Sequence, residues 1–187
     1  GDSNTTLSDV YSNTSDATRT TSIAVEGSYS ASVYSTGTNN GIYSFIGDGL
    51  NNYPERGDSF KYRVYLDNSG VGSWFFFGLQ DANNGQRNNA VGYSLRASAS
   101  VDEFDLQDKG GDGVIDQTNV SISSGEWYRV EVSWGDPTIS ATLYDSSDTS
   151  LATVSGDNTR HDTGGVMYVS EDRDTDGNVY WDNIRTT

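Results

Sequence analysis

The chain contains no cysteine, only two prolines and one histidine, and no long hydrophobic run. The absence of cysteine excludes disulfides, thiol catalysis and cysteine-ligated zinc or iron–sulfur sites. It does not exclude secretion, because a chain of 187 residues can bury a core that folds without cross-links. No segment approaches the roughly 20 apolar residues of a membrane helix, so no membrane insertion is expected. No N-terminal signal peptide is recognisable, which is expected of a mature or excised chain.

Positive charge is also scarce. Eleven Lys and Arg residues face 27 Asp and Glu residues, which gives a net charge of −16. Such a surface repels phosphates and anionic lipids, so neither nucleic acid nor membrane is an expected partner. The excess of Asp over Glu and of Arg over Lys resembles proteins of halophilic microbes, in particular haloarchaea. An acidic extracellular calcium-binding domain from an ordinary host is the alternative.

Aromatic residues and glycines are abundant, with 22 and 21 respectively. The clearest local pattern lies in Trp127–Trp134, where Tyr128, Val130, Val132 and Trp134 alternate with polar residues. This period of two predicts a strand with one buried face. Gly125 before it and Gly135-Asp136-Pro137 after it are typical of turns.

Similar patterns recur along the chain. Phe60, Tyr62, Val64 and Leu66 alternate with polar residues, whereas Trp74–Leu79 is apolar on both faces and is expected to be a central strand. About a dozen strands without a helical period predict an all-β fold, a two-sheet antiparallel β-sandwich. The prediction is a single jelly-roll domain over residues 1–187, with a loosely ordered start at 1–19.

Four segments carry a family resemblance, and they are Gly92–Arg96, Glu103–Leu106, Gly125–Val132 and Val179–Arg185. In this order they resemble a laminin-G-like member of the concanavalin A-like lectin/glucanase jelly rolls. The resemblance implies a fold shared by lectins, carbohydrate-binding modules, adhesion domains, glycosidases and lyases. It also implies a structural calcium ion near the last strand.

An acidic loop precedes that strand. Asp172, Asp174 and Asp176 alternate before Gly177, a spacing that lets carboxylates surround one Ca²⁺ ion. Asp182 is predicted to belong to the same site, because it is expected to face the core together with Tyr180 and Ile184. An acidic, solvated loop is the alternative.

Two further acidic segments resemble known functional motifs. Asp108, Asp112, Asp116 and Asn119 fall at positions one, five, nine and twelve of a calcium-like loop, but Gly110 occupies position three, so a glycine-rich hairpin is preferred. Glu103, Asp105 and Asp108 resemble the Glu-x-Asp-x-x-Glu motif of retaining glucanases, with a shortened last acid. Catalysis is therefore not expected there. The only histidine, His161, is interpreted as a loop residue.

Outward-facing polar and aromatic residues suggest a sugar-binding face, because sugars stack on aromatic rings while planar polar groups hold their hydroxyls. The residues predicted to bind ligand are Arg63, Tyr65, Arg96, Asp105 and Arg129, expected on one sheet, together with Trp74, expected nearby. A merely solvated sheet face is the alternative. Asn-x-Ser/Thr sequons at Asn4, Asn13 and Asn119 are possible glycosylation sites.

The sequence thus predicts a non-catalytic, extracellular carbohydrate-binding or adhesion module of a halophile, stabilised by calcium, with a glycan or cell-surface polysaccharide as its partner. A glycoside hydrolase or polysaccharide lyase of the same fold is one alternative. A structural domain of a surface layer, filament or viral appendage is another.

Overall fold

The computed structural model describes residues 11–25, 29–35, 41–48, 50, 53–172 and 176–186. Within these ranges the regular secondary structure is almost entirely strand, with short 3₁₀ turns η2 (Thr14–Asp16), η3 (Asn83–Gly85) and η4 (Arg87–Asn89). The strands are β1 (Ala17–Thr20), β2 (Ser30–Ser35), β3 (Gly41–Ser44), β4 (Ser59–Leu66), β5 (Val71–Asp81), β6 (Val91–Ser98), β7 (Glu103–Lys109), β8 (Gly113–Asn119), β9 (Trp127–Trp134), β10 (Thr138–Tyr144), β11 (Ser150–Asp157), β12 (Gly165–Asp172) and β13 (Gly177–Thr186). No helix among the described residues has the length and apolar character needed to cross a membrane.

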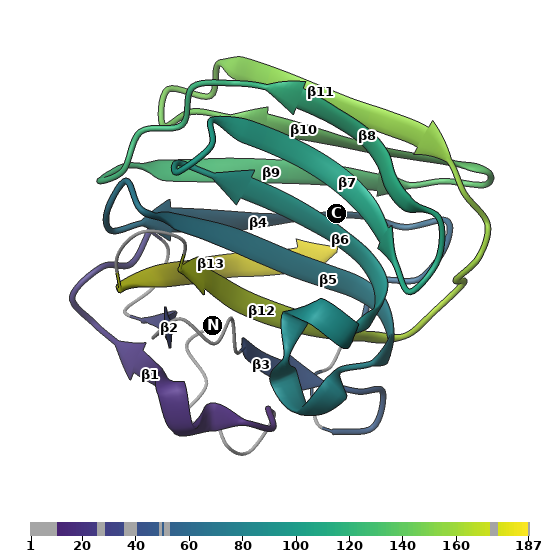
Figure 1. The fold of residues 1–187 in the computed structure, drawn as a ribbon, viewed down its shortest axis with the longest axis horizontal. Helices are drawn as coiled ribbons and strands as arrows, with labels where there is room; N and C mark the ends of the chain where they lie inside the picture. Colours follow the sequence, from purple (N-terminus) through teal and green to yellow (C-terminus); the bar gives the residue numbers. More distant parts are fainter. Residues whose placement is uncertain are drawn as a thin grey trace.

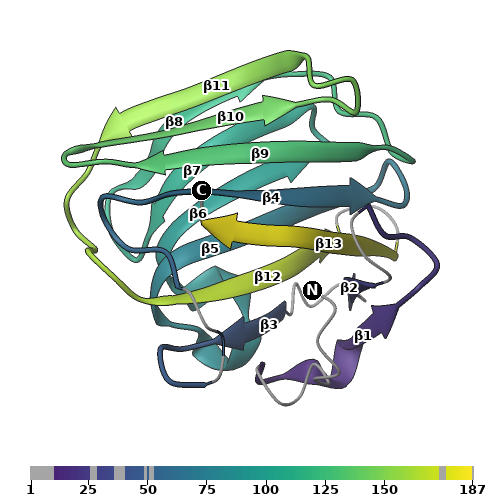
Figure 2. The same ribbon diagram turned by 180° about the vertical axis from the view of Figure 1, so that it is seen from behind.

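The strands form two antiparallel sheets. The seven-stranded sheet has the order β1-β2-β13-β4-β9-β10-β11, and the six-stranded sheet has the order β3-β12-β5-β6-β7-β8. Figure 1 views the molecule with the six-stranded sheet in front, and Figure 2 shows the seven-stranded sheet from the opposite side. The predicted β-sandwich is confirmed.

The core lies between the sheets. The inward residues of β9 and β4 are at most 3% exposed, as their alternation predicts; these are Tyr128, Val130, Val132, Trp134, Phe60, Tyr62, Val64 and Leu66. Aromatic rings fill much of the volume. Phe75, for example, lies with its ring centroid 4.5 Å from that of Tyr62 and 5.3 Å from that of Tyr168. Large rings therefore compensate for an apolar fraction of only 33%.

Strand β5 is buried on both faces, as predicted. Phe75 and Phe77 face the core between the sheets, whereas Trp74 and Phe76 belong to a second apolar cluster on the outer face. That cluster includes Met167 and Val169 of β12, and it is bordered by Ala82 and Ala90, which flank the 3₁₀ turns. This part of the outer face is therefore apolar and buried.

Candidate functional site

A cross-strand row on the outer face of the six-stranded sheet brings together three of the predicted binding residues. Trp74 on β5 pairs with Arg96 on β6, and Arg96 pairs with Asp105 on β7. Because Phe75, Leu95 and Phe104 fill the core, their chain neighbours must point outward. Sequence alternation and antiparallel register together create this row.

Arg96 lies between two carboxylates. Its Nε and Nη2 atoms are 2.6 and 2.5 Å from Oδ2 of Asp105, and Nη2 is 2.6 Å from Oε2 of Glu103. Gln107 donates a hydrogen bond of 3.0 Å to the other oxygen of Asp105. Asp105 has no exposed surface, and this burial raises its pKa to about 6, although the neighbouring guanidinium of Arg96 lowers it.

Trp74 is surrounded by charged groups. Its indole nitrogen donates a hydrogen bond of 2.8 Å to Glu171, which also forms an ion pair of 3.2 Å with Arg87. Three cationic groups lie within 4.6 to 5.3 Å of the ring centroid, namely those of Arg87, Arg96 and Lys109. Only 2% of Trp74 is exposed, so its ring is not an open stacking platform. We call Arg87, Arg96, Glu103, Asp105, Lys109 and Glu171, grouped around Trp74, the charged cluster.

The charged cluster contains three cationic and three anionic side chains, but the three anions pair with only two of the cations. Arg96 pairs with two carboxylates, and Arg87 pairs with Glu171. Among the described residues Lys109 forms no ion pair, although it is half-buried. Burial and the nearby cation of Arg87 lower the pKa of Lys109. Ionisable groups perturbed in this way are concentrated at functional sites.

The other predicted ligand residues lie on the opposite sheet. Arg63, Tyr65 and Arg129 belong to β4 and β9, so the expectation that all these residues share one sheet is wrong. Alternation shows that a residue points outward, but it does not show from which of the two sheets.

The outer face of the seven-stranded sheet has its own aromatic and charged contacts. The half-buried rings of Trp127 and Tyr180 lie 5.6 and 5.7 Å from that of Tyr65, and Arg129 lies 3.9 Å above the ring of Tyr144. A depression of about 520 Å³ on this face is lined by Ser59, Phe60, Lys61, Glu131, Val132, Ser133, Ser140, Thr142 and Tyr144.

The glucanase-like motif does not assemble. The β6–β7 register runs without interruption from Ser98–Glu103 to Gly92–Lys109, so Asp108 points away from Glu103 and Asp105. Asp108 is buried and accepts a hydrogen bond of 3.2 Å from Asn158, while its Oδ1 lies 3.4 Å from Nε2 of His161. Its role is therefore to anchor a loop.

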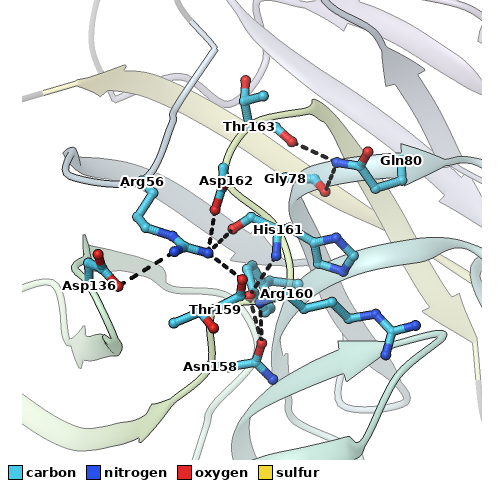
Figure 3. Close-up of polar contacts among 11 residues, drawn as sticks. Arg56, Gly78, Gln80, Asp136, Asn158, Thr159, Arg160, His161, Asp162 and Thr163 are labelled. Carbon is cyan, nitrogen blue, oxygen red and sulfur yellow. Dashed lines mark hydrogen bonds and ion pairs between the residues drawn. The ribbon is translucent and has the colours of Figure 1, made fainter.

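That loop connects β11 to β12 and contains His161, as predicted. The hydroxyl of Tyr93 donates a hydrogen bond to Asn158 and accepts one from the backbone of His161. Figure 3 shows Arg56 reaching the same loop, where it donates hydrogen bonds to the carbonyls of Thr159 and His161 and pairs with Asp162. These contacts hold the loop in place. Burial lowers the pKa of His161, whose side chain is 5% exposed.

The structure describes the acidic segment 108–116 in full and the acidic loop before β13 only in part. Residues 108–116 form the preferred hairpin, with positive φ angles at Gly110 and Gly113. Asp174 and the side chain of Asp172 lie outside the described residues. Asp176 is exposed and accepts a hydrogen bond of 3.3 Å from the hydroxyl of Tyr34. Among the described side chains, no group of three potential metal ligands occurs.

Asp182 does not face the core. Val179 and Trp181 do, so Asp182 lies on the outer face, where it is buried and accepts a hydrogen bond of 2.7 Å from the backbone of Val25. Six residues of strand, roughly 20 Å, separate it from Asp176. One ion cannot bind both, and the calcium prediction is reduced to Asp172, Asp174 and Asp176.

The three sequons lie in different surroundings. Asn4 is outside the described residues. The side-chain amide of Asn13 donates a hydrogen bond of 2.9 Å to the carbonyl of Gly41, whereas Asn119 is exposed at the end of β8. Only Asn119, of the two described positions, presents an exposed side chain.

Sequence reasoning missed three members of the charged cluster. Lys109 could have been found, because Glu103, Asp105, Gln107 and Lys109 alternate on one strand. Arg87 and Glu171 carried no comparable signal. They come from a turn and from a distant strand, and the fold alone brings them to Trp74.

No protein-family model matches this sequence, and no curated protein sequence does either. Similar solved structures include a carbohydrate-binding module, CBM66, from Bacillus subtilis, with a TM-score of 0.58 and 13% identity over 94% of this chain and 97% of that one. The Ca²⁺- and Man3GlcNAc-bound exoplasmic/lumenal domain of VIP36 has a TM-score of 0.55 and 7% identity over 92% and 83% of the two chains. A family 7 alginate lyase has a TM-score of 0.51 and 12% identity over 87% and 82%.

At these identities the comparisons establish the fold alone. The chain has the jelly-roll β-sandwich found in lectins, carbohydrate-binding modules and polysaccharide lyases. The laminin-G-like subdivision and the halophilic origin stay predictions.

Proposed function

We propose that this protein is a non-catalytic, extracellular carbohydrate-binding module that holds its glycan across the charged cluster of the six-stranded sheet. The observation that carries the proposal is the gathering of three cations around Trp74 on the outer face of a protein with a net charge of −16. Burying charges costs desolvation energy that ion pairing often does not recover, so such a cluster is poorly explained by stability alone. The shared fold is consistent with carbohydrate binding.

The glycan would meet the half-buried edge of the charged cluster. Glu103, Gln107 and Lys109 are partly exposed and lie at two-residue spacing on β7. Their carboxylate, amide and ammonium groups can bond to sugar hydroxyls. Trp74 would position Arg87, Arg96 and Lys109 from below, and would not itself stack on the sugar.

The geometry also favours binding over hydrolysis. A retaining glycosidase needs two carboxyl groups about 5 Å apart with the scissile bond between them. Here the guanidinium of Arg96 contacts both Glu103 and Asp105. Neither carboxylate is free to act as nucleophile or acid, which argues against the hydrolase alternative.

Calcium and salt belong to the same proposal. Asp172, Asp174 and Asp176 would hold one structural Ca²⁺ beside β13, because alternating carboxylates before a glycine suit a hard cation. The acidic surface would suit a halophile, since molar salt shortens the Debye length to ~3 Å and screens self-repulsion.

The test is affinity electrophoresis in gels that contain purified polysaccharides, combined with an assay for released sugar ends. Gln107→Ala is expected to weaken retention about fivefold, the loss of one hydrogen bond of about 1 kcal/mol. Tyr65→Ala, on the opposite sheet, is the control and is expected to retain wild-type binding. The reverse result would move the site to the seven-stranded sheet. Release of sugar ends that is lost in Glu103→Gln would establish the enzyme, and assembly without any glycan retention would favour the structural alternative.

A further inference from the structure

Lys109 occupies a distinctive position in the charged cluster. It ends β7, opposite Gly92, and its side chain points to the same outer face as those of Glu103, Asp105 and Gln107. Its ammonium nitrogen lies 5.2 Å from the centroid of the Trp74 ring. The side chain is half-buried, and within the described part of the chain no carboxylate forms an ion pair with it.

The ammonium group of Lys109 has two guanidinium groups near it but no carboxylate within ion-pair distance among the described residues. Arg87 and Arg96 repel it, while Asp105 and Glu171 attract it from beyond ion-pair distance. Both carboxylates are already bound, Asp105 to Arg96 and Glu171 to Arg87. An ammonium group is strongly hydrated, so partial burial without a carboxylate or equivalent anion is costly.

We infer that the glycan bound by this protein carries an anionic group, a carboxylate or a sulfate, that forms an ion pair with Lys109. This inference rests on the proposed function and names the chemical class of its ligand. An anion beside Lys109 would receive charge-assisted hydrogen bonds, which are about twice as strong as neutral ones. It would also meet the adjacent guanidinium of Arg87, whose side chain is 13% exposed.

The preference would be local and not a property of the whole surface. With a net charge of −16 the protein as a whole repels polyanions. Partly buried ion pairs are screened by salt much less than exposed ones. Molar salt would therefore suppress the general repulsion while leaving the pair with Lys109 largely intact.

The chain provides a matched control for the test. It has two lysines, and the second, Lys61, lies half-buried on β4 of the opposite sheet. Lys109→Gln and Lys61→Gln make the same change in net charge on opposite faces. Lys109→Arg keeps the charge at the site.

The experiment measures binding to immobilised polysaccharides at molar salt by titration. The polymers are a polyuronate, the same polymer with its carboxyl groups reduced to alcohols, and a sulfated polysaccharide. The polyuronate and sulfated arms identify which anion the site accepts. Matching thermal midpoints of the variants serve as the control for folding.

The expected result is that wild-type protein binds an acidic polymer at least tenfold more tightly than the reduced polymer. Lys109→Gln removes this preference, whereas Lys109→Arg and Lys61→Gln keep it. Equal binding of an acidic polymer by wild type and Lys109→Gln would overturn the inference, as would loss of binding confined to Lys61→Gln. Tighter binding of the neutral polymer, still weakened by Gln107→Ala, would overturn it while the proposed function stands. No retention of any polymer would overturn both.

Discussion

Arg96 and Asp105 form a two-point ion pair across neighbouring strands, with Nε and Nη2 of Arg96 lying 2.6 and 2.5 Å from one oxygen of Asp105. The residues are directly opposite in the β6–β7 register, and Asp105 has no exposed surface. A pair held at this burial is sensitive to the loss of either partner.

Replacing Arg96 by alanine should leave Asp105 buried without its cation. The expected loss of stability is about 3–5 kcal/mol, as for other broken buried pairs. Arg129→Ala is the matched control, because Arg129 pairs with Asp148 and Glu131, whose side chains are 65% and 44% exposed, and each such pair contributes about 1 kcal/mol or less. Denaturant unfolding measures the stability of both variants. Equal losses would contradict the prediction that the buried ion pair of Arg96 contributes more than the exposed pairing of Arg129.

Asp105 should also give the protein a distinct pH dependence. Burial raises its pKa from an ordinary 3.8 to about 6, so the folded state binds the proton more tightly than the unfolded state. Its contribution to stability is therefore greatest below about pH 4 and falls by roughly 3 kcal/mol as pH rises through about 6. In Asp105→Asn this component is absent. The difference in unfolding free energy between wild type and the variant should change between pH 4 and 6, and a flat difference would refute the assignment.

Gly78 allows strand β5 to pass close to the core tryptophan of β9. Its φ angle is +58°, and a methyl group there would lie 2.8 Å from the ring of Trp134. Gly78→Ala should cost more than the about 1–2 kcal/mol of a left-handed non-glycine residue. Gly125→Ala, at φ +83° with open space around it, isolates the backbone cost. Thermal unfolding that shows similar midpoints for both variants would argue against the close contact.

Calcium should stabilise the folded protein through the loop before β13. After chelation, a hundredfold excess of Ca²⁺ over its dissociation constant should add about 2.7 kcal/mol and raise the thermal midpoint. The double variant Asp174→Asn/Asp176→Asn should lose the shift. Asp112→Asn/Asp116→Asn, in the β7–β8 hairpin, makes the same charge change and should keep it. A shift that persists in the first variant would place the ion elsewhere.

Salt should raise stability over a wide range. With a net charge of −16, the free energy of unfolding is expected to increase from low salt to 1 M NaCl, where the Debye length is ~3 Å. Denaturant titrations in urea, which does not alter ionic strength, measure this directly. Maximum stability at low salt would remove the physical basis for a halophilic origin.

The sequence by itself determined which segments are strands and which of their side chains are buried. Val130 and Val64 could be assigned to the core because a period of two has one apolar face. Phe75 and Phe76 are adjacent and point to opposite faces, so two apolar residues in succession predict a strand that is buried on both faces. These properties depend on local alternation, which can be read along the chain.

Only the tertiary structure decided which outward residues meet. Arg96 and Arg129 have similar local patterns, yet they lie on opposite sheets, because strand order depends on long-range pairing. The sequence pattern predicts the wrong face for Asp182 because Tyr180 and Trp181 are both aromatic, and either can fill the core. In the charged cluster, Arg87, Lys109 and Glu171 come from separate segments and contact the same indole ring. Their spacing along the sequence does not predict this contact.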